Sequence, residues 1–265
     1  MTTQIHPTAI VDKGSEIGKN TIIHPYTVIG HNVKIGENCE IGPMVHIHKN
    51  TTIGNNNKLD SFVSIAGEPQ DLRFKDQTTY VEIGDNNIFR EYTHINRGTD
   101  EGSKTKIGSN CYFMGGVHVG HNSKVDDYVI LVNSCALGGY TEIGRRVFLS
   151  ASTAVHQFVK IGAYCMIAPL TKPAQDIPPF TMCIGASNAV VVGLNSVGLR
   201  RAGLTLEERN LIKKIYKIFY RQKLPRKEAM EKIRQLGDSW VIAEWVDFIN
   251  NSTRGIMRYG SHTED

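Results

Sequence analysis

The chain has 265 residues, of which 40% are hydrophobic and 21% are charged, and its formal net charge is +4. This composition is typical of a soluble globular protein, and the mild charge does not indicate nucleic-acid binding. The chain contains no apolar run of about 18 residues that could span a membrane. Its first residues, MTTQIHPTAI, lack the charged and then apolar pattern of a secretion signal. We therefore expect a cytoplasmic protein without an integral membrane segment.

A six-residue repeat occupies residues 5–167. Steps of six from Ile5 meet an aliphatic residue or Phe at 25 of 28 positions, the exceptions being Asp71, Gln77 and Glu101. A small residue precedes each large one by two positions, and residues two apart in a strand point to the same face. The pattern predicts a coil of short parallel strands that sends one large and one small side chain of each hexad inwards. Gly often follows the large residue, where we expect it to relieve the backbone at a corner.

This hexapeptide signature resembles the left-handed parallel β-helix acyltransferase superfamily. The resemblance implies triangular coils of three hexads each, stacked at the strand spacing of about 4.8 Å. Four of the five cysteines fall in the small inward column, namely Cys39, Cys111, Cys135 and Cys165. We therefore expect buried, unreactive thiols rather than a disulfide framework or a nucleophile.

Two polar segments, 66–80 and 98–105, interrupt the repeat without changing its phase and are predicted to be loops that leave the coil and return to it. The repeat ends near residue 170, and a Pro-rich connector follows. Thr205 and Glu208 form a capping box at the start of the first of three predicted helices, and the other two lie near 226–236 and 240–251. We predict a β-helix over residues 1–190 and a C-terminal α-helical domain over 191–265. The basic residues of this tail form either a solvated helix face or a docking surface for an acidic partner.

The coil spacing places several candidate catalytic residues together. His121 and Gly139 are 18 residues apart, which is one full coil, so they should be neighbours on adjacent coils. An imidazole can act as a general base, and a glycine N–H can donate to a developing oxyanion without side-chain obstruction. The pairing therefore suits acyl transfer. The same edge of the coil is predicted to hold His118, Tyr140, His156 and Gln157.

A zinc site is the main alternative for these histidines. Hexapeptide β-helices include zinc carbonic anhydrases, which use two histidines five residues apart and a third from a neighbouring coil. No two histidines of this chain are five apart. We expect neither a metal nor another cofactor.

Several longer motifs narrow the resemblance to one family. These motifs are QDLRF (70–74), INRGT (95–99), HVGHN (118–122), AVHQFVKIGA (154–163), AQDIPPF (174–180), the segment 195–201 and STRG (252–255). Together they resemble the acyl-[acyl-carrier-protein]–UDP-N-acetylglucosamine O-acyltransferases, and the similarity covers the whole chain. The family transfers a 3-hydroxyacyl chain from acyl carrier protein to the 3-hydroxyl of UDP-N-acetylglucosamine, the first step of lipid A biosynthesis. It also implies a homotrimer with sites between subunits.

The resemblance assigns roles to individual residues. His121 matches the general base, and Gly139 matches the backbone donor to the thioester oxygen. The remaining matches are to substrate-binding positions at Asp71, Arg73, His118, Asn122, Tyr140, His156 and Gln157, to nucleotide-binding positions at Asn195 and Arg201, and to the acyl-length ruler at Pro169. A residue as large as proline at the ruler implies a chain shorter than the longest that the family uses.

The chain departs from the family beside its base. Asn122 stands where the family has an Asp paired with the catalytic histidine, and Tyr140 replaces a histidine. These changes leave open whether the acceptor carries a 3-hydroxyl or a 3-amino group. The alternatives are a related β-helix acyltransferase, such as the N-acyltransferase of the same pathway or an enzyme that uses a CoA donor, and a non-enzymatic scaffold. The N-acyltransferase carries an additional N-terminal uridine-binding domain, for which a repeat starting at residue 5 leaves no room.

Overall fold

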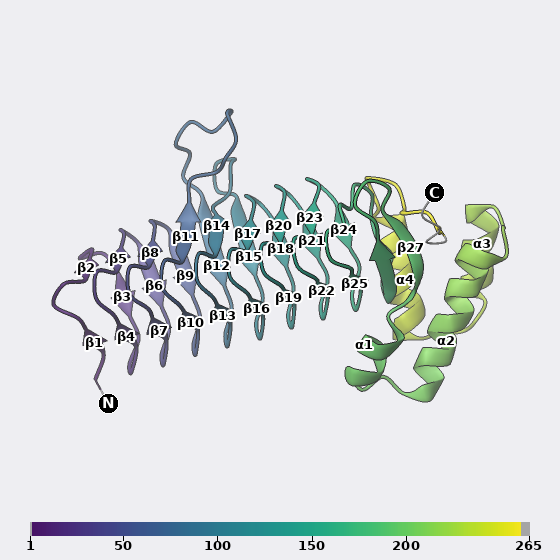
Figure 1. Ribbon diagram of the computed structural model, residues 1–265, viewed down its shortest axis with the longest axis horizontal. Coiled ribbons are helices and arrows are strands. Elements are labelled where there is room, and N and C mark those ends of the chain that lie inside the picture. Colours follow the sequence, from purple (N-terminus) through teal and green to yellow (C-terminus); the bar gives the residue numbers. More distant parts are fainter. Residues whose placement is uncertain (1, 261–265) are drawn as a thin grey trace.

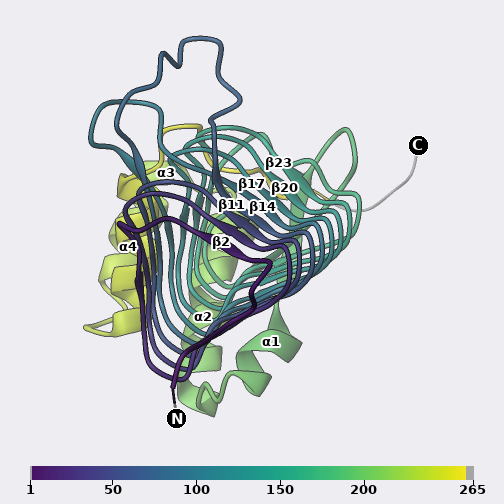
Figure 2. The same ribbon diagram turned by 90° about the vertical axis from the view of Figure 1, so that its left-hand side faces the viewer.

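The computed structural model describes residues 2–260 and forms a left-handed parallel β-helix with helices at its C-terminal end (Figure 1). Seen along its axis, the coil is triangular, and each side of the triangle is one parallel sheet (Figure 2). The sheets contain 11, 8 and 8 strands and are called A, B and C below. The β-helix and the helical tail predicted from the sequence are therefore both confirmed.

Successive strands pass from sheet A to sheet B to sheet C, and most of them are two residues long. Sheet A contains β1 (Gln4–Ile5), β4 (Ile22–Ile23), β7 (Glu40–Ile41), β10 (Lys58–Leu59), β13 (Ile88–Phe89), β16 (Tyr112–Phe113), β19 (Ile130–Leu131), β22 (Phe148–Leu149), β25 (Met166–Ile167), β26 (Thr181–Ile184) and β27 (Val190–Leu194). Sheet B contains β2 (Ile10–Val11), β5 (Val28–Ile29), β8 (His46–Ile47), β11 (Ser64–Gly67), β14 (His94–Asn96), β17 (His118–Val119), β20 (Ala136–Leu137) and β23 (Ala154–Val155). Sheet C contains β3 (Glu16–Ile17), β6 (Val33–Ile35), β9 (Thr51–Ile53), β12 (Tyr80–Ile83), β15 (Lys104–Ile107), β18 (Lys124–Val125), β21 (Glu142–Ile143) and β24 (Lys160–Ile161).

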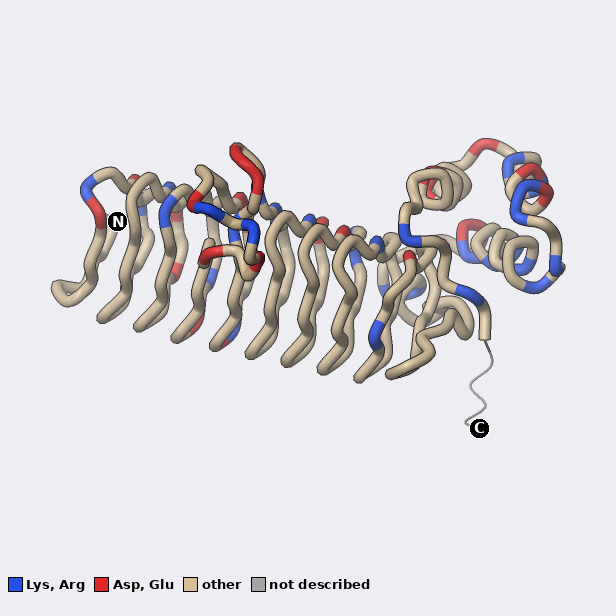
Figure 3. Tube along the Cα trace, turned by 90° about the horizontal axis from the view of Figure 1, so that it is seen from above, with Lys and Arg blue, Asp and Glu red and all other residues tan. Residues whose placement is uncertain are grey.

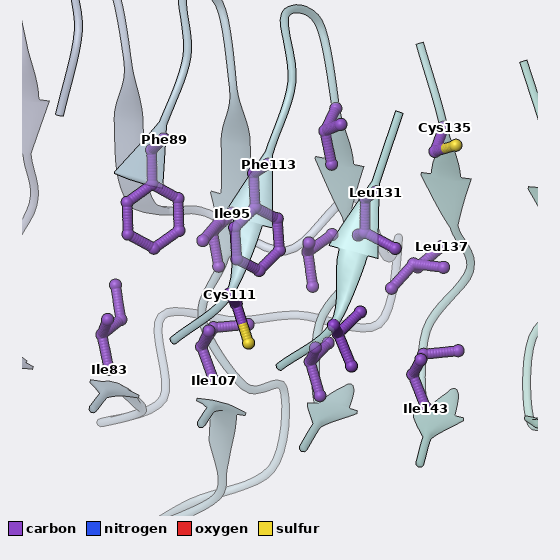
Figure 4. Close-up of a cluster of buried hydrophobic side chains, with 14 of the residues drawn as sticks. Ile83, Phe89, Ile95, Ile107, Cys111, Phe113, Leu131, Cys135, Leu137 and Ile143 are labelled. Carbon is purple, nitrogen blue, oxygen red and sulfur yellow. The ribbon is translucent and has the colours of Figure 1, made fainter. Parts of the chain in front are cut away.

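The two inward columns predicted from the hexads form the core. Large side chains stack in register from coil to coil, as Ile23 does on Ile41, and small residues such as Thr27 and Cys135 lie buried between them. Figure 4 shows this packing, in which Phe89 and Phe113 are stacked with their ring centroids 4.7 Å apart. All five cysteines are free and buried, as predicted for the four in the inward column. Burial raises the pKa of Cys111 to about 12, so this thiol is protonated at neutral pH.

The explanation expected for the repeated glycines is wrong. Positive φ occurs at the third residue after the large one, as at Asn56 with φ 55°, and the glycines next to the large residue do not have it. A Cβ on Gly36 would instead lie 2.6 Å from the backbone of Gly54 in the next coil. Glycine is needed there because adjacent coils approach closely, while the left-handed corner residue is most often an Asn or an aromatic residue.

Both interruptions of the repeat leave the coil at the same corner, between sheets B and C. The first connects β11 to β12 and the second connects β14 to β15, and they rise together above the coil in Figures 1 and 2. Ile53 pairs with Ile83 at a spacing of 30 residues, and Ile95 pairs with Val119 at 24. Both spacings are multiples of six, which is why the phase survives, as the sequence predicted.

The C-terminal region packs on the last coils around a second core that includes Phe180 and Trp245. Its helices are α1 (Ser196–Arg201), α2 (Leu206–Tyr216), the π-helix η1 (Lys217–Arg221), α3 (Arg226–Arg234) and α4 (Trp240–Asn250). The capping box of Thr205 and Glu208 is present at the start of α2. Figure 3 shows the basic residues gathered on these helices.

Two features of this region were not predicted, the short α1 and the antiparallel pairing of β26 with β27. The division at residues 190 and 191 stays a prediction, and β27 crosses it. No helix within residues 2–260 is long and apolar enough to cross a bilayer.

Candidate active site

His121 lies on the corner between sheets B and C, directly after β17, in the same corner column from which both loops emerge. The turn forms because Val119 is the inward residue of its hexad and Asn122, three positions later, takes the left-handed conformation with φ 60°. The His121 side chain is therefore held between the loops and the next coil. Its Nδ1 lies 3.0 Å from Oδ1 of Asn122.

Gly139 lies against the imidazole of His121, as the spacing of one coil predicted. A Cβ on Gly139 would lie 2.5 Å from both Cε1 and Nε2 of His121, so only glycine fits here. The Gly139 N–H donates to no backbone acceptor within residues 2–260. The pair therefore offers a ring nitrogen and a backbone donor close to each other.

Tyr140 connects this corner to the second loop. Its ring meets that of His121 edge to face, with a centroid distance of 5.3 Å, and is stacked on Phe158. Its hydroxyl lies 2.8 Å from Oγ1 of Thr99 and donates to Asp100 at 2.8 Å. Burial, and then the hydrogen bond to Asp100, raise the pKa of Tyr140, so the phenol stays protonated.

The first loop brings Asp71 and Arg73 to the same corner. Arg73 donates to both carboxylate oxygens of Asp71, from Nε at 3.2 Å and from Nη2 at 2.9 Å. These bonds lower the pKa of Asp71 to about 2, and His121 is close enough to contribute to the shift. The loop thus presents an ionised carboxylate and a guanidinium beside the candidate base.

His118 and His156 flank His121 on the same edge of the coil. Burial, with His94 and His121 as smaller causes, lowers the pKa of His118 to about 4, so this imidazole is neutral at pH 7. His118 Nδ1 lies 3.3 Å from Nδ1 of His94 in the preceding coil. His156 is exposed, and its Nδ1 lies 3.1 Å from the carbonyl oxygen of Gln157. The structure thus brings these predicted residues to one edge.

Three predicted residues lie elsewhere in the chain. Asn195 caps α1 by accepting from the Gly198 N–H, and with Arg201 it lines a groove of ≈ 570 Å³ over sheet A. Pro169 is exposed on the corner between sheets A and B. Within one chain, the predicted nucleotide-binding residues and acyl ruler are therefore separated from the corner of His121.

The sequence analysis did not assign roles to several residues at this corner. They are Thr99 and Asp100 in the second loop, and Arg254, whose Nη2 lies 3.4 Å from Nδ1 of His156. The 24-residue register between His94 and His118 is the signal that places the second loop over the corner of His121. Residues 2–260 contain no group of three or more His, Cys, Asp or Glu side chains arranged to hold a metal ion.

Comparisons with known proteins agree with this geometry. Residues 14–49 match the model of the bacterial transferase hexapeptide (six repeats), and residues 176–257 match domain 2 of UDP N-acetylglucosamine O-acyltransferase. A Burkholderia orbicola protein named acyl-[acyl-carrier-protein]–UDP-N-acetylglucosamine O-acyltransferase is 44% identical over 97% of this chain and 100% of its own length.

Solved structures show the same similarity. The UDP-N-acetylglucosamine acyltransferase of Francisella novicida is 38% identical with a TM-score of 0.92, covering 96% of this chain and 94% of its own. The UDP-N-acetylglucosamine O-acyltransferase of Moraxella catarrhalis is 37% identical with a TM-score of 0.93, covering 97% of this chain and 100% of its own. The chain therefore belongs to the family of acyl-[acyl-carrier-protein]–UDP-N-acetylglucosamine O-acyltransferases.

Proposed function

We propose that this chain transfers a 3-hydroxyacyl group from acyl carrier protein to the 3-hydroxyl of UDP-N-acetylglucosamine, the first step of lipid A biosynthesis, in the cytoplasm. The observation that carries the proposal is the pairing of His121 with Gly139 at the corner where both loops emerge. Membership of the family supplies the two substrates.

In the proposed reaction, Nε2 of His121 takes the proton of the acceptor hydroxyl. The hydroxyl oxygen bonds to the thioester carbonyl carbon, and the Gly139 N–H donates to the oxygen that becomes negative. The carbon–sulfur bond then breaks, and the proton passes from His121 to the departing thiolate of the carrier. Because the other ring nitrogen is held by Asn122, Nε2 is the nitrogen available for this exchange.

Asp71 and Arg73 are proposed to bind the sugar, with the polar edge of His118, His156 and Gln157. Asn195 and Arg201 are proposed to bind the nucleotide end, where a guanidinium suits a diphosphate. Since these two residues lie over sheet A, away from the corner of His121, a complete site needs a second subunit. This separation supports the homotrimer.

A 3-amino acceptor is the second candidate, and Asn122 is the observation that favours it. A neutral amide beside His121 gives the imidazolium less stabilisation than a carboxylate would. An amine attacks without prior loss of a proton, so it demands less of the base. Turnover of both acceptors in parallel assays decides between them.

The donor length is the least constrained part of the proposal. Pro169 is proposed to shorten the acyl pocket, which favours a chain below the family maximum. Assays with a series of 3-hydroxyacyl carrier proteins should show a preference for shorter donors, and replacing Pro169 with Gly should extend it. A wild-type preference for the longest donor contradicts this assignment.

The decisive test compares His121→Ala with His31→Ala, using UDP-N-acetylglucosamine and 3-hydroxyacyl carrier protein. Both histidines sit in the local sequence Gly-His-Asn at the same corner of the coil, but His31 is far from the loops and pairs with Asp12. Loss of a general base should lower kcat by about 10²–10⁴-fold in His121→Ala. His31→Ala should keep full activity. Absence of transfer by the wild-type protein, or full activity of His121→Ala, would overturn the proposal.

A further inference from the structure

Three contacts of the Asn122 side-chain oxygen determine how His121 is held. The oxygen lies 3.0 Å from the Thr99 N–H nitrogen, 2.9 Å from Thr99 Oγ1 and 3.0 Å from Nδ1 of His121. A backbone N–H can only donate, so the oxygen of the amide, and not its NH₂ group, must face Thr99. The same oxygen faces His121, whose Nδ1 must therefore carry the proton. This leaves the lone pair on Nε2, the nitrogen beside Gly139.

The contacts continue from Thr99 to a carboxylate. Tyr140 donates to Oδ2 of Asp100, and its oxygen lies 2.8 Å from the Thr99 hydroxyl, which is shared between Tyr140 and Asn122. Four hydrogen bonds thus join His121 to Asp100 through Asn122, Thr99 and Tyr140. The second loop is held in place independently, because Glu101 accepts from the N–H of Thr78 in the first loop.

The same local sequence behaves differently elsewhere in the coil. His31 and Asn32 also follow a glycine, and Asn32 also has positive φ. Asn32 donates its amide to Asn50 of the next coil at 2.9 Å, and His31 contacts Asp12 instead. The arrangement at His121 is therefore imposed by the second loop and Tyr140, not by the turn itself.

We propose that Thr99, Tyr140 and Asp100 are positioning residues of the acyl transfer, and that Asp100 supplies, through this hydrogen-bonded chain, the negative charge that Asn122 lacks beside His121. The inference rests on His121 being the base. Two other charged groups face this corner, Asp71 and Arg73, and they are paired with each other. Arg73 also acts on Tyr140 and Asp100, so the chain ends between the two loops.

The first test is Asp100→Asn, with Glu101→Gln as the matched control in the same loop. Each substitution removes one negative charge and keeps an acceptor oxygen. Asp100→Asn should lower kcat roughly tenfold, with the KM of both substrates within about twofold, because the barrier rises while ground-state binding does not. Glu101→Gln should leave kcat unchanged. Equal losses in both variants, or an unchanged kcat in Asp100→Asn, overturn the inference, whereas the proposed function fails only if His121→Ala stays active.

A second background separates a relayed charge from a structural role. Asn122→Asp places a carboxylate directly beside His121, so Asp100→Asn should then cost less than about twofold. Tyr140→Phe breaks the same chain without touching Asp100, should reproduce the loss in kcat, and should not add to it. Additive losses in the double variants contradict the relay. If Asp100→Asn fails to fold, Tyr140→Phe and its pairing with Asn122→Asp carry the test.

The ring nitrogens provide a direct readout. In the protein labelled with ¹⁵N-histidine, the wild-type His121 should show a protonated Nδ1 and an unprotonated Nε2 at a pH where the ring is neutral. Thr99→Val should increase the fraction of the opposite tautomer, and Thr99→Ser, which keeps the hydroxyl, should restore the wild-type ratio. A wild-type His121 protonated mainly on Nε2 contradicts the inference.

Discussion

Gly139 shows how the absence of one side chain defines the candidate site. Its missing Cβ leaves room for the His121 ring, and its N–H is left without a backbone acceptor in residues 2–260. Neither feature depends on a special backbone conformation, because Gly139 does not have positive φ. The requirement is steric, so its test is a single methyl group.

Gly139→Ala should displace the imidazole of His121, since the new Cβ would lie 2.5 Å from Cε1 and Nε2. A misplacement of this size should lower kcat about 10²-fold. Gly193→Ala is the matched control, because a Cβ there meets no atom within 4 Å. Steady-state kinetics and circular dichroism of both variants check this. Normal turnover by a folded Gly139→Ala protein would show that the ring position is not critical.

The same residues also mark what local sequence can predict. The hexad spacing placed Gly139 against His121 because a β-helix repeats strictly at 18 residues. It could not place Thr99 on Asn122, because that contact depends on the path of the inserted loop and on a side-chain direction. Local sequence alone is also insufficient, as the identical Gly-His-Asn triplets at His31 and His121 have different partners.

At the scale of the element, each corner makes two opposite demands. At residues 54–56, a Cβ on Gly54 would lie 2.8 Å from the oxygen of Gly84, while Asn56 has φ 55°. The hexad pattern predicted the strands because their inward positions are regular, but it assigned the glycine to the wrong demand. It also missed α1, which has only six residues, includes Gly198 and has no acidic residue in its first turn.

Gly54→Ala should therefore destabilise the coil by about 1–3 kcal/mol, as expected for a group forced into filled space. Asn56→Gly, two residues later, should change stability by no more than about 0.5 kcal/mol, because glycine adopts the left-handed conformation readily. Denaturant unfolding of both variants measures the difference. If the two substitutions cost the same, the close approach of adjacent coils is not what selects Gly54.

The histidines of sheet B and its corner should couple folding to pH. Burial is the main cause that lowers the pKa of both His48 and His118 to about 4, from 6.5. Between pH 6.5 and pH 4 the unfolded chain therefore binds more protons than the folded one, so stability falls as the pH falls through this range. The unfolding temperature should fall likewise, and His48→Gln should reduce the fall. An unchanged pH dependence in that variant would contradict the role of His48.

At the scale of the whole molecule, the surface of the coil is divided by chemistry. The outward side chains of sheet C alternate in charge and form ion pairs between coils, such as Lys34 with Glu16 at 2.9 Å. The corner between sheets A and B instead exposes a column of large apolar side chains, namely Tyr26, Met44, Phe62 and Tyr92. An exposed apolar column of this kind is typical of a protein–protein interface.

The proposed homotrimer should therefore depend on this column. Tyr92 is 65% exposed and stacks on Phe62 with ring centroids 5.2 Å apart, so Tyr92→Glu should place a charge in the interface and reduce the oligomer mass measured by light scattering. Glu82→Gln, on the charged face of sheet C, is the control and should keep the wild-type mass. Activity should fall with assembly, because Asn195 and Arg201 lie over sheet A and His121 lies on the corner between sheets B and C. A monomeric wild-type protein with full activity would show that one chain forms the site alone.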